Sequence, residues 1–139
     1  MRRALALVAI LTLAVGCAAP DPIVVADPWA RPLPPGAEVT AIYLTLTARQ
    51  DDALTGLASP DCGSLELHNS TLTDGVMKMR QVTLPFALDA HTPLAMAPGG
   101  HHLMCMAPGD GFTVGGSVEV TLSFEHAGDI TLAVPVEQR

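Results

Sequence analysis

The stretch SVEVTLSFEHAGDITLAVPVE, from Ser117 to Glu137, carries the strongest secondary-structure signal in the chain. Apolar and polar residues alternate on both sides of the short segment HAGD, which is the pattern of two half-buried strands joined by a turn. The stretch therefore predicts an antiparallel hairpin close to the C-terminus.

Several other segments show the same short-strand pattern. In AEVTAIYLTLTA, residues 37–48, Ile42, Leu44 and Leu46 share the more apolar face, which is expected to point to the core. Further strands are expected in IVVADPW, ALTGLASP, CGSLELHN, GVMKMRQV, HTPLAMAPGG and HHLMCM. The chain has 12 Gly and 12 Pro and no sustained helical period after its N-terminal apolar run. The sequence thus predicts an all-β fold, a Greek-key sandwich or barrel of about eight or nine antiparallel strands.

The N-terminus has the pattern of an export signal. Two arginines precede an apolar run of about twelve residues, which is short for a membrane span. The run ends in LAVGCAAP, where small residues precede Cys17 as in a bacterial lipobox. We predict that residues 1–17 form a lipoprotein-type signal segment with lipidation at Cys17. Residues 18–26 are then a tether, and residues 27–139 are one domain. An ordinary signal peptide cut nearby is the alternative.

The net charge of the chain and its predicted export limit the classes of function it can have. The chain carries 7 Lys and Arg against 14 Asp and Glu, a formal net charge of −7. A domain this acidic is a poor binder of nucleic acid and suits cations or a basic surface on a partner. The export signal predicts a periplasmic protein that its lipid anchor attaches to a membrane. An enzyme is not predicted, because no nucleophile stands next to a base, and Glu66 near His68 is either a surface residue or a partner of that histidine.

The cysteine count predicts a disulfide. With Cys17 lipidated, Cys62 and Cys105 remain as an even pair in an oxidising compartment. Alternation along the strand puts Cys105 on the face opposite Met104, which favours a structural bond over metal ligation. The bond would close a loop of about forty residues and stabilise the fold by roughly 3–4 kcal/mol.

Histidine and methionine gather in HHLMCM, residues 101–106. Alternation places His102, Met104 and Met106 on one face of this strand and His101 on the other. His102 and Met104 therefore project side by side, with Met106 behind them in the core or at the rim.

His68 and Met79 supply a second such pair from an earlier hairpin. If folding joins the two pairs, two imidazoles and two thioethers converge. This donor set favours Cu(I) over hard cations, and its affinity is expected to fall as histidines protonate below an unperturbed pKa of about 6.5. His91 and His126 lie beside turns and are expected on the surface. The alternative interpretation is that the paired methionines only fill the core.

The spacing of these residues resembles that of the periplasmic copper chaperones called PCu(A)C. Their hallmark is a His, ten residues, a Met, about twenty-one residues, then His-x-Met. Here ten residues separate His68 from Met79, and one residue more than the family spacing separates Met79 from His102-Leu103-Met104. The extra residue raises His101 as an alternative ligand, but Leu103 rather than Met follows it at the second position. The blocks DPWARPLPPG, AIYLTLTA, LELH, DGVMKMR and LAMAPGGHHLM are also similar to family blocks.

The resemblance implies a cupredoxin-like β-sandwich with His68, Met79, His102 and Met104 as ligands of one Cu(I), and it leaves Cu(II) open. It also implies delivery of copper towards cytochrome c oxidase, beside a Sco-type chaperone or the oxidase copper subunit. Many members carry another methionine just after the first histidine, where this chain has Asn69 and Ser70.

Two functions from other classes stay open. One is a metal-free, lipid-anchored structural sandwich. The other is a blue-copper electron-transfer protein, which the residue order disfavours because the usual ligand loop runs Cys, His, Met.

Overall fold

The computed structural model describes residues 19–139. All regular secondary structure in this range is β-strand. No helix among these residues is long and apolar enough to cross a membrane. The predicted signal segment and Cys17 lie outside the described residues. The strands are β1 (Ile23–Ala30), β2 (Val39–Ala48), β3 (Asp52–Ala58), β4 (Cys62–Thr73), β5 (Val76–Gln81), β6 (Phe86–Leu88), β7 (Leu94–Ala95), β8 (His101–Pro108), β9 (Ser117–Phe124) and β10 (Gly128–Pro135).

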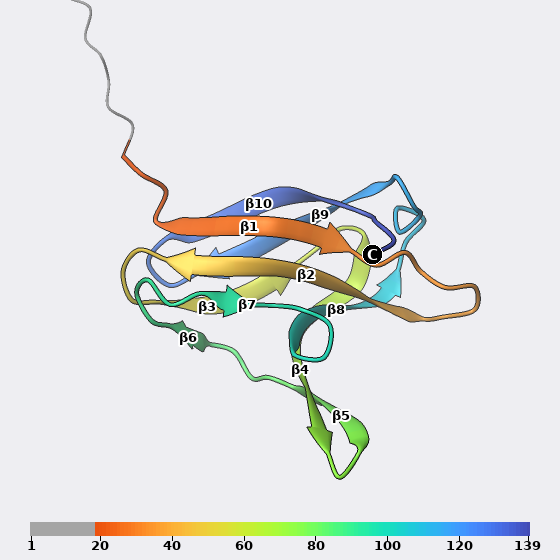
Figure 1. Ribbon diagram of the computed structural model, residues 1–139. Helices are drawn as coiled ribbons and strands as arrows, with labels where there is room; N and C mark the ends of the chain where they lie inside the picture. The colour runs from red at the N-terminus through yellow and green to blue at the C-terminus, as the bar shows by residue number, and fades with distance from the viewer. Residues whose placement is uncertain (1–18) are drawn as a thin grey trace, which may run out of the picture.

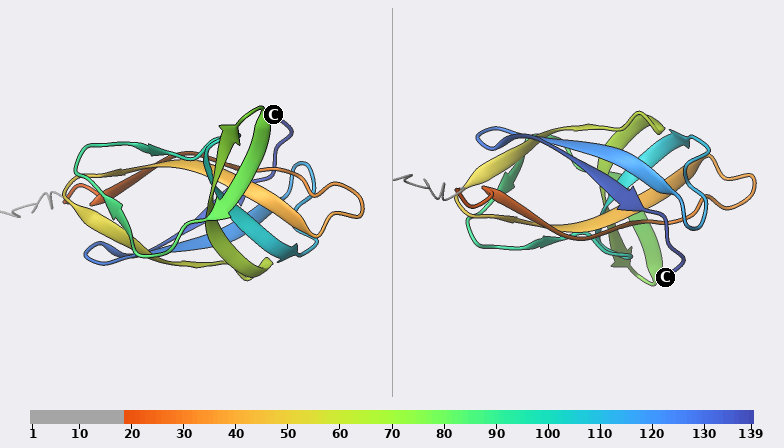
Figure 2. Two further views of the ribbon diagram at one scale, coloured as in Figure 1. Left: turned by 90° about the horizontal axis from the view of Figure 1, so that it is seen from below. Right: turned by 90° about the horizontal axis from the view of Figure 1, so that it is seen from above.

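The strands form two antiparallel sheets that pack as the layers of a sandwich (Figure 1). The larger sheet has the order β1-β2-β8-β4-β5, and β7 also pairs with β2. The smaller sheet has the order β10-β9-β3-β6. Figure 2 shows these layers from below and from above. The all-β prediction is confirmed, and the C-terminal hairpin forms as expected, with Gly128 of β10 opposite Phe124 of β9.

The core lies between the sheets and is built from alternate residues. Ile42, Leu44 and Leu46 of β2 are buried against Val120 and Leu122 of β9, as the alternation in each segment predicts. Each such side chain stabilises the fold by about 1.5–3 kcal/mol when fully buried. The other face of β2 is thereby left for the outer surface of the larger sheet.

Two features differ from the sequence predictions. The tether expected over residues 18–26 is shorter than predicted, because Ile23 to Ala26 pair with β2 and belong to the sheet. This pairing agrees with the strand expected in IVVADPW. The three-residue strand β6, which pairs with β3, was not expected, because three residues are too few to show an alternation.

The β4–β5 hairpin projects from the sandwich (Figures 1 and 2). Its turn consists of Asp74 and Gly75, whose φ angles are 53° and 76°. Both values lie in the left-handed region that a two-residue turn of this kind requires and that Asp-Gly adopts readily. The hairpin therefore extends β4 and β5 beyond the core.

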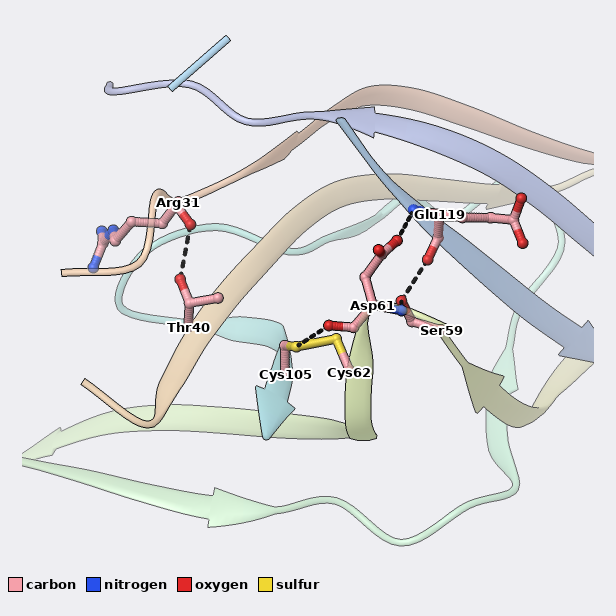
Figure 3. Close-up of a disulfide and its surroundings, with 7 residues drawn as sticks. All are labelled: Arg31, Thr40, Ser59, Asp61, Cys62, Cys105 and Glu119. Atoms are coloured by element: carbon pink, nitrogen blue, oxygen red, sulfur yellow. Dashed lines mark hydrogen bonds between the residues drawn. A yellow bond between two sulfur atoms is a disulfide. The ribbon is translucent and has the colours of Figure 1, made fainter. Parts of the chain in front are cut away.

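The start of β4 is fixed to both sheets (Figure 3). Cys62 and Cys105 of β8 form a disulfide with their Cα atoms 5.5 Å apart. The neighbouring Asp61 carboxylate accepts a hydrogen bond of 2.8 Å from the backbone N–H of Glu119 on β9. The disulfide holds the strand that carries His68 against the strand that carries His102, and the hydrogen bond ties the start of this strand to the smaller sheet.

Candidate metal centre

His68 and His102 lie on the outer face of the larger sheet. They are direct cross-strand partners on β4 and β8, and their ring centroids are 5.9 Å apart. Met104 follows on the same face of β8, opposite Glu66 of β4. The pairing of β4 with β8 therefore joins residues that are distant in the sequence into one group of donors.

Hydrogen bonds fix the tautomers of both imidazoles. His102 Nδ1 lies 3.0 Å from the carbonyl oxygen of Gly100, which can only accept, so Nδ1 carries the proton and Nε2 the lone pair. His68 Nε2 lies 2.9 Å from a carboxylate oxygen of Glu66, so Nε2 donates and Nδ1 carries the lone pair. In metal sites, a carboxylate or carbonyl that accepts from the second ring nitrogen fixes the tautomer and the orientation of the bound histidine in the same way.

The remaining nitrogen of each ring is buried and has no partner. His68 Nδ1 and His102 Nε2 are the two buried side-chain nitrogen or oxygen atoms in residues 19–139 that lack a hydrogen bond. A buried lone pair without a partner is unfavourable and calls for a ligand or an ordered water. Both atoms belong to residues that the sequence predicts as metal ligands.

Burial keeps His102 neutral. Its side chain is only 3% exposed, and this desolvation lowers its pKa below 6.5. The hydrogen bond to Gly100 acts in the opposite direction, while charge on His68, His101 and Arg31 adds to the lowering. Neutral imidazole is the form that binds a metal, so His102 is ready to bind at neutral pH.

Thioethers line a hollow beside His102. Met79 of β5 lies opposite Ser70 of β4, which places it on the same face of the sheet as His68. Met79 is 50% exposed, whereas Met104 is buried. Both border an open hollow of about 290 Å³. Its lining also includes His102, Met77, Ser70, Arg31, Tyr43, Thr40 and Ala41. His68 is not among the lining residues and adjoins the hollow through His102.

An aromatic wall buries His102 although it lies on an outer face. Tyr43 of β2 lies with its ring centroid 6.2 Å from that of His102, and Trp29 of β1 stacks on Tyr43 at 4.6 Å. The Arg31 guanidinium covers Tyr43 at 5.8 Å from the ring centroid. The sequence alone did not indicate these residues as part of the site. The alternation along β2 indicates the face of Tyr43, but only the order of β1, β2 and β8 brings Tyr43 and Trp29 to the histidine.

The other candidate ligands lie elsewhere. His101 points away from His102 and meets the ring of Phe86 edge-on, at 5.6 Å between centroids. His91 and His126 are exposed, as expected. Met106 is half-buried on β8. Cys105 faces the core and is bonded to Cys62, so neither sulfur is a thiolate in this structure.

The chemistry of the group is that of a soft-metal site. In the described range, no three His, Cys, Asp or Glu side chains lie close enough to hold an ion together. The face instead offers two imidazole lone pairs and two thioethers. Neutral, soft donors of this kind suit Cu(I) and poorly suit Mg²⁺ or Ca²⁺.

Fold and donor set together define a small β-sandwich with soft-metal donors on the outer face of one sheet. A family model described as "Putative lipoprotein LpqE-like" matches residues 23–136. The chain belongs to the LpqE-like family. A relative from Leifsonia xyli subsp. xyli, "Putative lipoprotein Lxx21020", is 29% identical over 119 residues, which are 84% of this chain and 70% of the relative.

Solved structures agree with this assignment. The copper-bound PCuAC domain from PmoF2 superposes with a TM-score of 0.70 at 27% identity, covering 88% of this chain and 97% of that domain. The Cu(I) form of DR1885 from Deinococcus radiodurans gives a TM-score of 0.63 at 28% identity, covering 84% and 78%. These likenesses confirm the resemblance to PCu(A)C and the cupredoxin-like sandwich.

Proposed function

We propose that the protein is a copper chaperone, not an enzyme, and that it binds one Cu(I) through His68, Met79, His102 and Met104. The observation that carries the proposal is the pair of facing histidines. Each has an outer hydrogen bond that fixes its tautomer, and each has a buried nitrogen that lacks a partner. Two thioethers on the same face complete a neutral, four-donor set.

The donor set favours Cu(I) over competing ions. Thioethers stay unprotonated and hold no charge, so a monovalent soft cation loses little by exchanging water for them. Zinc prefers thiolate, imidazole or carboxylate, and both domain cysteines are in a disulfide. Methionine ligands also suit an oxidising compartment, where free thiols are lost to disulfides.

The exposure of the ligands suits transfer. His102 and Met104 are buried in the sheet, whereas half of the Met79 side chain is open to solvent. An incoming ligand from another protein can replace Met79 first, while His102 and Met104 still hold the ion. Copper then passes by ligand exchange without being released into water.

Names of similar proteins support copper as the cargo. The PmoF2 domain is described as copper-bound and DR1885 as a Cu(I) form. The lipoprotein descriptions of the family model and of Lxx21020 agree with export and a lipid anchor at Cys17. We place the protein in the periplasm on this basis. We extend the proposal to delivery towards the copper centre of cytochrome c oxidase, with a Sco-type chaperone or the oxidase copper subunit as partner.

A Cu(I) titration of the processed protein against a competing chelator tests this function. One equivalent is expected to bind. Loss of an outer partner of a metal ligand costs about 10–100-fold in affinity, so loss of two ligands in M79A/M104A is expected to cost more than about 100-fold. Met106→Ala, on the same face of β8, is the matched control and should bind like the natural protein. Equal affinity of M79A/M104A and the natural protein would rule out the ligand set.

A further inference from the structure

The projecting β4–β5 hairpin ends in an open sheet edge. β5 is the last strand of the larger sheet, and in the described part of the chain it pairs with β4 only. All six residues of β5 are exposed. The outer backbone N–H and C=O groups of such a strand can pair with another extended chain.

The two faces of β5 differ in chemistry. Met77 and Met79 point to the face that carries the histidines, because they lie opposite Leu72 and Ser70 of β4. The alternate residues Lys78 and Arg80 point to the reverse face. A strand laid along β5 would therefore meet thioethers on one side and cations on the other.

The paired part of this hairpin, residues 68–81, carries a net positive charge, opposite in sign to that of the whole chain. Lys78 and Arg80 are two of only seven basic residues, against 14 acidic ones. The hairpin also carries Asp74, but in its turn and not along β5. Its tip exposes Leu72 and Val76, which are 69% and 58% accessible. Leu72 lies opposite Met77 on the histidine face, and contiguous exposed apolar side chains of this kind mark interaction sites.

We propose that the free edge of β5 is a strand-addition site for an extended, acidic segment of the protein that exchanges copper with this domain. Main-chain hydrogen bonds give such complexes their affinity, and alternate side chains give them their specificity. Acidic residues of the added strand face Lys78 and Arg80. The residues between them face Met77 and Met79.

Two other occupants fit this edge less well. Pairing of β5 with β5 of a second copy would put the Lys78 and Arg80 side chains of both copies on one face, and like charges on neighbouring strands repel. An anionic membrane would engage only one of the two faces and leave the backbone groups of the edge unpaired. An acidic strand can pair with the backbone groups of the edge and contact the side chains on both faces of β5.

This position has a consequence for copper exchange, and that consequence rests on the proposed function. A strand paired with β5 lies next to Met79, the ligand that is most exposed to solvent. Side chains of the docked strand on the same face then stand within reach of the metal. Docking at β5 thus brings donor and acceptor ligands together without opening the buried His102.

The test uses the copper-free, processed protein and three synthetic peptides with capped ends and a fluorescent label. The peptide (Glu-Val)4 is the acidic strand, (Lys-Val)4 reverses its charge, and (Glu-Pro)4 keeps the charge but cannot form a strand ladder. Fluorescence anisotropy measures binding, and amide hydrogen exchange locates it. We expect (Glu-Val)4 alone to bind and to protect residues 76–81.

Matched variants identify the cations. K78Q/R80Q and R49E both lower the net charge by two, but Arg49 lies away from the hairpin. Exposed ion pairs are weak, so K78Q/R80Q is expected to weaken (Glu-Val)4 binding by roughly fivefold, and R49E by less than about twofold.

The inference is overturned if (Glu-Pro)4 or (Lys-Val)4 binds as well as (Glu-Val)4, or if both variants behave alike. Protection of β5 that rises with protein concentration alone would assign the edge to a second copy. Protection by phosphatidylglycerol vesicles in place of the peptide would assign it to a membrane. Because no copper is present, peptide binding by a protein that fails to bind Cu(I) would remove only the proposed function. Binding of Cu(I) by a protein that fails to bind the peptide would remove only this inference.

Discussion

His68 and His102 stand directly opposite each other on β4 and β8, with their ring centroids 5.9 Å apart. Each ring is held by one outer hydrogen bond, to Glu66 or to the Gly100 carbonyl, and each keeps one buried nitrogen without a partner. Sheet register, not sequence proximity, makes this pair. The proposed metal site depends on it.

Met79 and Met77 provide an internal comparison. Both are on the same face of β5 and are about equally exposed, at 50% and 55%. Met79 is opposite Ser70, one step nearer His68, whereas Met77 is opposite Leu72 nearer the tip. Met79→Ala should lower Cu(I) affinity by more than about tenfold, because the loss of a ligand costs more affinity than the loss of a residue that only hydrogen-bonds to a ligand. Met77→Ala should lower it by less than about threefold in the same chelator competition. A larger loss for Met77→Ala would reassign the ligand.

Glu66 is expected to position His68. Its carboxylate accepts from His68 Nε2 and so directs the lone pair of Nδ1 to the site. Glu66→Ala should weaken Cu(I) binding by about tenfold, and Glu66→Gln, which keeps an acceptor oxygen, should restore most of the affinity. Glu119→Ala removes an exposed carboxylate on β9 and controls for charge. If Glu66→Gln and Glu66→Ala lose affinity equally, the effect is one of charge and not of orientation.

Burial of His102 makes the stability of the copper-free protein depend on pH. Its pKa is lowered in the folded protein, whereas in the unfolded chain it is about 6.5, so the unfolded state binds more protons between these two values. The free energy of unfolding therefore rises with pH in this window. The contribution is fully present above about pH 6.5 and is lost as pH falls through the lowered pKa.

Urea unfolding between pH 7.5 and pH 5 measures this dependence. The slope for one proton is at most about 1.4 kcal/mol per pH unit. His102→Gln should have a smaller slope than the natural protein, whereas His91→Gln, at an exposed turn, should keep the full slope. A slope that His102→Gln leaves unchanged would show that another group titrates.

The disulfide should matter for stability and not for copper. Cys62 and Cys105 are separated by 43 residues, and a loop of this size is worth about 4 kcal/mol on the chain-entropy model. We expect C62S/C105S to lose about that much in urea unfolding and to bind one Cu(I) as before. The double variant leaves no free thiol in the domain to bind copper. A change in copper stoichiometry would place a cysteine in the site.

The local sequence pattern predicted which face of a strand each side chain occupies, because this depends only on alternation. The inward face of β2, with Ile42 and Leu44, follows from a two-residue period, and the same period separates His102 from His101. The ligand candidates also follow from donor chemistry. These features need no knowledge of which strands are neighbours.

Features that depend on strand order could not be predicted. The wall of Tyr43 and Trp29 over His102 exists only because β2 lies between β1 and β8. The Cys62–Cys105 bond follows from the cysteine count and not from alternation, because alternation in β4 places Cys62 on the face of His68 whereas Cys105 faces the core. The strand deviates there, where a Cβ at Gly63 would lie 3.0 Å from the Cβ of Ala107. This close approach of β4 to β8 has no signature in the local pattern.

X-ray absorption spectroscopy of the Cu(I)-loaded protein tests the central claim most directly, because it counts the donor atoms around the metal. The proposed ligands predict two nitrogen neighbours at about 2.0 Å and two sulfur neighbours at about 2.3 Å, as is typical of imidazole and sulfur bonds to a soft metal. Met79→Ala should remove one sulfur and keep both nitrogens. A shell of nitrogen and oxygen alone, or a sulfur shell that Met79→Ala and Met104→Ala leave intact, would contradict the proposed site.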